Sequence, residues 1–219
     1  MKWIEKIVVV LAVTCACSAQ TISSKTSSNK VIWSPPRIDW PQVELPSTVP
    51  KEMIGKFRIA NFQIVLEKTE LEAAQKHFGG KVGYRGDGGD SEGWLCLHGS
   101  DADGPWIFWL TSGELDGPAV TGFQWRRLPS NETPDRRCVL IPPSKGGIEL
   151  PLALHPGMTE AEMRKIVGKP SFVSGKTLIY SHEHQETIHD LAYTVDNMIA
   201  IVLRDGIVSA IETSKSTVN

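Results

Sequence analysis

The sequence predicts an α+β fold of two tandem repeats, each a short helix packed on an antiparallel β-meander. The pattern Thr-Glu-x-Glu occurs twice, beginning at Thr69 and at Thr159, and both times it precedes a short amphipathic segment. Runs rich in β-branched and aromatic residues follow each segment and are separated by turn residues. We therefore place one repeat at residues 51–141 and the other at residues 148–219.

The composition is that of a globular protein and excludes several classes. Of the 219 residues, 41% are hydrophobic and 22% are charged, unlike a collagen, a coiled coil or a wholly disordered chain. The formal net charge is −2, so no overall basic field attracts the chain to nucleic acid or to anionic lipid. We expect no nucleic-acid partner.

Residues 1–19 have the pattern of an export signal. Two lysines precede the short apolar run at residues 7–13, and small residues lead to Ala19. Cleavage after Ala19 predicts an exported protein, periplasmic or secreted. Lipid attachment at Cys15 or Cys17 is the alternative, and it is the only route by which we expect contact with a membrane.

Residues 20–50 form the predicted linker, rich in Ser and Thr at first and then in Pro. The proline density excludes a helix or a central strand and favours extended backbone. We expect a spacer that holds the folded part away from its exit surface. In the alternative, Trp33, Trp40 and Val43 dock on the folded part.

The first repeat is expected to begin with a helix whose apolar side chains Leu71, Ala74 and Phe78 lie on one face. Gly79 is suited to the position at which this helix ends, because glycine readily adopts the left-handed conformation common there. Three strands are then expected, at residues 93–99, 105–113 and 119–128.

The second repeat follows the same plan. Its helix after Thr159 places Met163, Ile166 and Val167 in register on one face and ends at Gly168. Strands are expected at residues 176–184, 191–197, 198–206 and 207–213. The dipeptide Asp205-Gly206 predicts a tight turn before the last strand.

Residues 152–170, LALHPGMTEAEMRKIVGKP, carry a family resemblance. The order of Gly157, Met158, Thr159, Gly168 and Pro170 is similar to the repeat of the SmpA/OmlA (BamE) outer-membrane lipoproteins and of the β-lactamase inhibitor protein. The resemblance implies a helix on an antiparallel sheet, a location in the cell envelope, and action by binding proteins without catalysis. It implies no particular partner and no contact residue.

If the signal is removed, Cys96 and Cys138 are the two cysteines that remain, which is an even number. In an oxidising compartment such a pair predicts a structural disulfide. A reactive thiol or a metal-binding pair is the alternative, although no Cys-x-x-Cys spacing supports either.

Tryptophans are concentrated on the strands of the first repeat. We expect at least one of Trp94, Trp106, Trp109 and Trp125 to be exposed and to contribute to a partner site, because indole rings are favoured interface anchors. Trp106 and Trp109 should face opposite sides of the sheet. In the alternative, the rings form the core between the repeats.

We therefore expect an exported, non-enzymatic protein that binds a protein partner in the cell envelope, with no cofactor and no assigned catalytic residue or metal ligand. One alternative is a module that binds glycan or peptidoglycan through exposed tryptophans. The other is a metal-dependent hydrolase that uses His182, His184 and His189.

Overall fold

The protein is mostly β and is dominated by one large sheet. The computed structural model describes residues 30–36, 45–47, 54–87, 91–113 and 117–219. The structure is 54% strand and 13% helical, and its main sheet has nine strands. The predicted α+β fold of two helix-on-meander repeats is therefore wrong.

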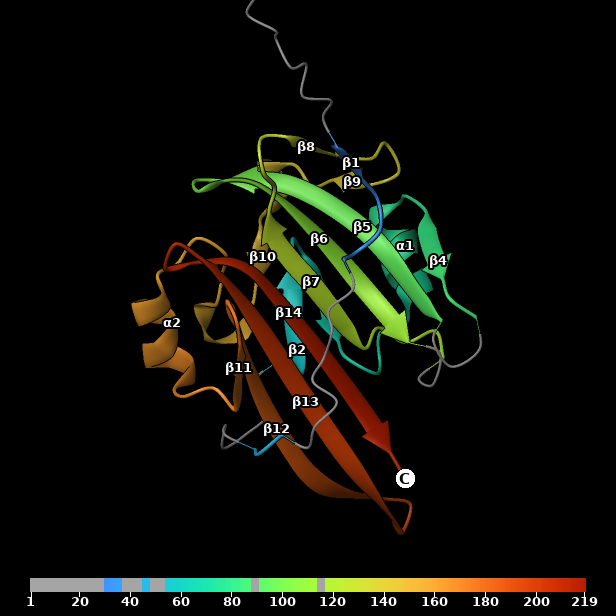
Figure 1. The fold of residues 1–219 in the computed structure, drawn as a ribbon. Helices are drawn as coiled ribbons and strands as arrows, with labels where there is room; N and C mark the ends of the chain where they lie inside the picture. Colours follow the sequence, from blue (N-terminus) through green and yellow to red (C-terminus); the bar gives the residue numbers. More distant parts are fainter. Residues whose placement is uncertain (1–29, 37–44, 48–53, 88–90, 114–116) are drawn as a thin grey trace, which may run out of the picture.

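The large sheet is almost entirely antiparallel, in the order β11-β12-β13-β14-β7-β6-β5-β4, with the short β9 running parallel beside β5 (Figure 1). Its strands are β4 (Val82–Arg85), β5 (Glu92–Asp101), β6 (Gly104–Gly113), β7 (Gly122–Arg127), β9 (Val139–Leu140), β11 (Phe172–Ser174), β12 (Thr177–Ile188), β13 (Leu191–Arg204) and β14 (Ile207–Val218).

The two predicted meanders join through their last strands, β7 and β14. Trp125 pairs with Ile211, and the pairing continues in register from Gly122 to Arg126. Two separate meanders would each leave a strand with unpaired backbone groups at this edge, whereas the junction satisfies both edges. The second meander also divides differently from the expectation, because residues 191–204 form the single strand β13 and residues 172–174 add the strand β11.

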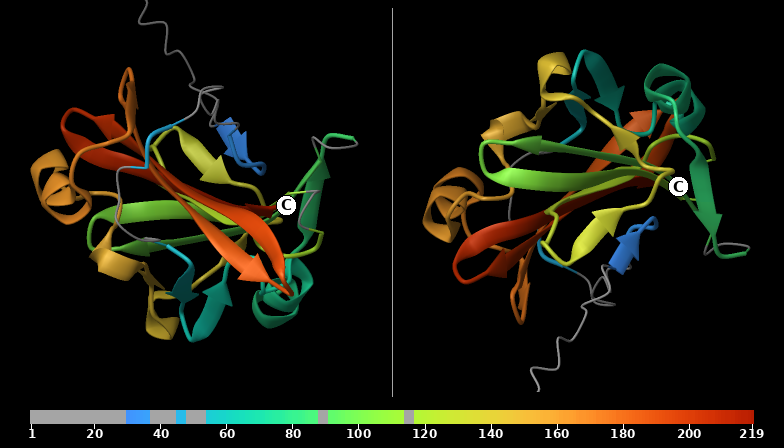
Figure 2. Two further views of the ribbon diagram at one scale, coloured as in Figure 1. Left: turned by 90° about the horizontal axis from the view of Figure 1, so that it is seen from below. Right: turned by 90° about the horizontal axis from the view of Figure 1, so that it is seen from above.

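One face of the large sheet, which we call the helix face, packs against a second layer. This layer contains the three-stranded sheet of β10 (Ile148–Glu149), β2 (Lys56–Ile59) and β3 (Phe62–Val65), together with α1 (Leu71–Phe78). The right panel of Figure 2 shows β2, β3 and α1 on this side and β1 on the other. The largest hydrophobic cluster fills the space between the layers.

Both helices are short, and only the second has the predicted capping box. In α2 (Glu160–Val167), the Thr159 hydroxyl accepts a hydrogen bond from the backbone N–H of Glu162, whose carboxylate accepts from the backbone N–H of Thr159. Before α1, by contrast, the Thr69 hydroxyl accepts from the backbone N–H of Val65, so this helix begins without a side-chain cap.

The opposite face, which we call the strap face, is covered near its centre by residues 30–36, the N-terminal strap. Its strand β1 (Lys30–Ile32) pairs in parallel with β8 (Glu132–Pro134). Beyond β1, the indole N–H of Trp109 donates to the Trp33 carbonyl at 2.9 Å. The spacer interpretation is therefore wrong for this part of the predicted linker, and Trp33 docks as the alternative proposed. Trp40 and Val43 lie outside the described residues, as does the predicted signal at residues 1–19.

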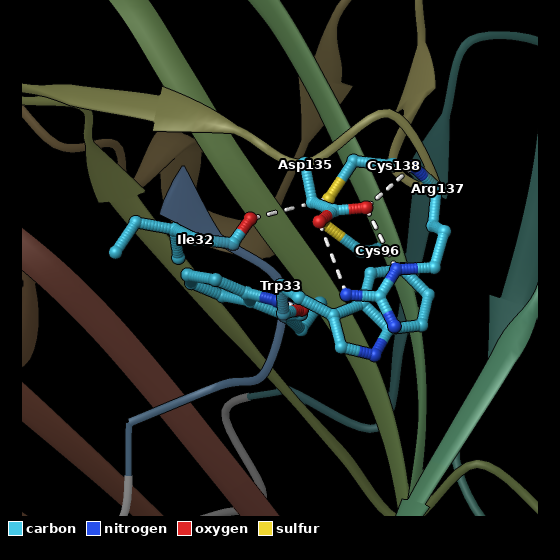
Figure 3. Close-up of a disulfide and its surroundings, with 7 residues drawn as sticks. Ile32, Trp33, Cys96, Asp135, Arg137 and Cys138 are labelled. Atoms are coloured by element: carbon cyan, nitrogen blue, oxygen red, sulfur yellow. Dashed lines mark hydrogen bonds and ion pairs between the residues drawn. A yellow bond between two sulfur atoms is a disulfide. The ribbon is translucent and has the colours of Figure 1, made fainter. Parts of the chain in front are cut away.

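The structure contains a disulfide between Cys96 and Cys138, as the cysteine arithmetic predicts (Figure 3). Cys96 belongs to β5 and faces the strap, whereas Cys138 lies in the loop before β9. The same loop holds the strap, because the backbone N–H of Asp135 donates to the Ile32 carbonyl at 2.8 Å.

A surface contact completes this attachment. The guanidinium of Arg137 lies 4.3 Å from the centre of the Trp33 ring and is hydrogen-bonded to Asp135 (Figure 3). That hydrogen bond is the main reason that the pKa of Asp135 falls to about 2. The disulfide, the loop and the strap thus form one connected unit.

Replacing both cysteines, Cys96→Ala with Cys138→Ala, should lower the free energy of unfolding by about 4 kcal/mol, the chain-entropy cost expected for a separation of 42 residues. Denaturant unfolding of the variant and the oxidised native protein measures the difference. A loss below about 1 kcal/mol would show that the disulfide adds little to the contacts around it.

Candidate functional site

A groove of about 540 Å³ opens where the β5–β6 turn approaches the segment that leads from β9 to α2. The turn contributes residues 100–103, and the segment contributes parts of residues 141–155, including the 3₁₀ turns η2 (Pro143–Lys145) and η3 (Pro151–Ala153). Its volume lies within the range of about 300 to 1,000 Å³ found for ligand pockets. This groove is the candidate functional site.

The floor of the groove is apolar and contains two of the predicted tryptophans. Trp106 and Trp125 line it together with Ile141 and Leu154. Each indole is only 3% exposed, and the Trp125 Nε1 is buried without a hydrogen-bond partner among the described residues. The floor is therefore formed by tightly packed side chains, the two indole rings among them.

Trp106 depends on a glycine in the neighbouring strand. Gly99 is its register partner on β5, and a Cβ at this position would lie 2.5 Å from the indole Cζ2 and 2.9 Å from the Ile141 carbonyl oxygen. The ring therefore occupies the space that a side chain at residue 99 would need.

Arg127 organises the rim. Its guanidinium donates to Asp101 at 2.5 Å and to Asp103 at 3.0 Å, which fixes both carboxylates of the β5–β6 turn. It also donates to the Pro156 carbonyl at 2.6 Å. One side chain thus ties the turn to the segment before α2, and the planar guanidinium with its charge-assisted hydrogen bonds holds a fixed geometry.

Gly157 permits this close approach. Its φ of +109° is unfavourable for other residues, and a Cβ would lie 3.0 Å from Asp103 Oδ2 and 3.3 Å from Arg127 Nη2. The glycine of the Gly-Met-Thr motif therefore has a structural role beside the rim.

The groove is acidic. Its described lining contains the carboxylates of Asp101, Asp103 and Glu149 and no Lys or Arg. Arg127 lies behind the rim and pairs with Asp101 and Asp103, and Arg58 on β2 lies 3.9 Å from Glu149, so these two arginines balance two of the three charges. His155 also lines the groove, with its Nδ1 3.9 Å from Asp103 Oδ2.

None of the four predicted tryptophans is exposed. Their exposed fractions are 3% for Trp94, 3% for Trp106, 0% for Trp109 and 3% for Trp125, so the expected exposure is wrong. Trp106 and Trp109 do face opposite sides of the sheet, as alternation predicts. Both sides are covered, the helix face by the second layer and the strap face by the strap. Trp106 and Trp125 still reach the candidate site as its floor.

The three histidines of the hydrolase alternative do not come together. His182 and His184 lie on one face of β12, with ring centroids 5.2 Å apart. His189 lies in the turn beyond the strand, about 16 Å from His184 at about 3.3 Å per residue. Across the described ranges, no group of three or more His, Cys, Asp or Glu side chains is arranged to hold a metal ion.

A second, smaller cavity of about 320 Å³ lies on the strap face, beside Pro36. Its lining includes the carboxyl group of Glu212 on β14, which is 9% exposed and receives a hydrogen bond from Gln124 on β7. Burial raises the pKa of Glu212 to about 9, and the charge of Glu92 adds to the rise while Arg85 opposes it. Glu212 is therefore a neutral acid at pH 7.

Sequence reasoning missed the residues that shape both cavities. The sequence places Arg127 only at the end of a predicted strand. Two aspartates in a single predicted turn, Asp101 and Asp103, favour a nearby cation and are the one local signal for it. No local signal identifies Glu212, because its burial depends on strands and a strap that are distant in sequence.

Glu212→Gln should stabilise the protein increasingly between pH 4.5 and pH 9. The unfolded carboxyl ionises near pH 4.5, whereas the folded one stays neutral to about pH 9, so native stability falls across this window at up to about 1.4 kcal/mol per pH unit. Denaturant unfolding at pH 4.5 and pH 8 checks this, with the exposed Glu149→Gln as the matched control. If the difference in free energy of unfolding between Glu212→Gln and native protein is the same at both pH values, the raised pKa of Glu212 is contradicted.

Within the described part of the chain, no helix is long and apolar enough to cross a membrane. Compared with family models, with curated proteins and with solved structures, the chain matches none.

Proposed function

We propose that this chain is an exported, non-enzymatic binding protein of the cell envelope. Its groove receives an apolar side chain of a protein partner, and basic residues of the partner flank that anchor. The observation that carries the proposal is the combination of an apolar floor with three rim carboxylates and no Lys or Arg in the described lining.

The shape of the groove favours a side-chain anchor. A preformed pocket of about 540 Å³ accommodates one or two side chains, and burial of such anchors supplies most of the affinity at protein interfaces. The Arg127 contacts hold the rim in place, so little conformational entropy is lost on binding.

The charge of the groove favours a basic partner segment. Asp101 and Asp103 are 38% and 53% exposed at their side chains, and Glu149 is 69% exposed. Carboxylates placed at a rim steer oppositely charged partners and penalise acidic ones. We therefore expect Lys or Arg beside the apolar anchor.

Two observations support an envelope location. The disulfide between Cys96 and Cys138 is typical of an oxidising compartment, and residues 1–19 have the pattern of an export signal. The similarity of residues 152–170 to the SmpA/OmlA (BamE) and β-lactamase inhibitor repeat also favours action by protein binding. A glycan partner fits the groove less well, because the buried indoles offer no open face for a sugar ring to stack on.

Selection of displayed peptides against the purified protein tests the proposal. The enriched peptides should combine an aromatic or large aliphatic residue with nearby Lys or Arg. Ala102→Arg, which places bulk and positive charge at the exposed turn, should weaken their binding at least tenfold, and Glu149→Lys should weaken it several-fold.

Glu186→Lys is the matched control, because it makes the same charge change as Glu149→Lys on an exposed residue of β12 outside the groove. All three variants should unfold at the native temperature. If the selected peptides bind Ala102→Arg with the same affinity as native protein, the proposal is overturned. Binding of glycan, but not of peptide, that is lost in the same variant would also overturn it.

A further inference from the structure

The smaller cavity on the strap face has the features of a separate ligand site. It lies where the ends of β7, β13 and β14 meet Pro36 of the strap, and its volume is about 320 Å³. Apolar side chains form most of the described lining, among them Leu128, Val202 and Ala210. The groove lies on the opposite face of the sheet, and Trp125 is the one residue that the two described linings share.

Among the lining side chains that face the strap, two buried polar atoms have no hydrogen-bond partner in the described part of the chain. They are Oε2 of Glu212 and Nε of Arg126, and each residue lines the cavity. An unsatisfied buried polar group is destabilising, so such groups are rare unless a ligand or water completes them. Glu212 is more than nine-tenths buried, which makes it the stronger indication.

The position of Arg126 is fixed by its other contacts. Its Nη2 lies 2.8 Å from a carboxylate oxygen of Glu132, and its guanidinium lies 5.5 Å from the centre of the Trp109 ring. These contacts leave the Nε–H as the donor available to a ligand. Arg204 adds a further positive charge to the lining, so a cationic ligand is disfavoured.

Burial raises the pKa of Glu212 and so favours its neutral form, while the charged groups around it act in both directions. Glu92 on β5 and Arg85 on β4 act on it with opposite signs, and Arg126 lies on the adjacent strand β7. On the other side, β13 offers only the methyl group of Ala200 as the register partner. A neutral carboxyl donates through its O–H and Arg126 through its Nε–H, so the lining of the cavity offers two donors.

We propose that this cavity binds a small apolar carboxylic acid in its anionic form. The ligand carboxylate accepts hydrogen bonds from the Glu212 carboxyl and from the Arg126 Nε–H, and its hydrocarbon tail lies against Leu128, Val202 and Ala210. The ligand thereby satisfies both unpaired groups and fills the apolar part of the cavity.

Isothermal titration calorimetry of the purified protein with sodium octanoate tests this site, and octanol serves as the ligand control. The native protein should bind octanoate at pH 7 at least tenfold more tightly than octanol. Octanoate affinity should fall about tenfold per pH unit once the pH exceeds the Glu212 pKa of about 9, because an ionised Glu212 repels the ligand. Equal binding of octanol and octanoate, or no octanoate binding, would overturn the proposal.

Two variants separate the polar and apolar parts of the site. Ala210→Leu fills the cavity and should abolish octanoate binding while the protein stays folded. Glu212→Gln should bind a few-fold more weakly than native protein at pH 7, with the same affinity at pH 10 as at pH 7. Native affinity in Ala210→Leu, or a native pH dependence in Glu212→Gln, would show that octanoate binds elsewhere.

Discussion

The central strands of this sheet are apolar on both faces, and the structure depends on covering both. Trp109 on the strap face and Phe108 on the helix face are adjacent in β6, and each is 0% exposed. An antiparallel sheet commonly leaves one face to water, whereas this sheet needs a layer on each side. The strap supplies the second layer, and its Trp33 and Pro36 carbonyls accept hydrogen bonds from Trp109 and Gln124.

Strand β7 connects this constraint to both sites. Its side chains alternate, so Trp125 contributes to the groove on the helix face while Gln124 and Arg126 face the strap and the Glu212 cavity. Arg127, the next residue, returns to the groove and fixes its rim. The strap therefore covers the Glu212 cavity directly. It also stabilises β7, which contributes Trp125 to the floor of the groove.

Local patterns in the sequence predicted both helices and the long strands of the large sheet, but they missed β2, β3 and β10 of the second layer and divided β13 in two. The helix periods, the Asp205-Gly206 turn and the cysteine pair are all local or countable signals, and each has its counterpart in the structure. The joining of β7 to β14 depends on residues about 85 positions apart, for which no local pattern exists. The tryptophans were misjudged for the same reason, because alternation gives the face of a ring but not what covers it.

The claim that the strap is an integral layer of the fold is tested most directly by hydrogen exchange at the Trp109 indole. Its Nε1–H donates to the Trp33 carbonyl at 2.9 Å, so it exchanges only when the strap leaves the sheet. We predict exchange as slow as that of the backbone amides in the centre of β6, which open only on global unfolding. Exchange of the indole proton at the rate of an exposed tryptophan, with the β6 amides still protected, would contradict the account.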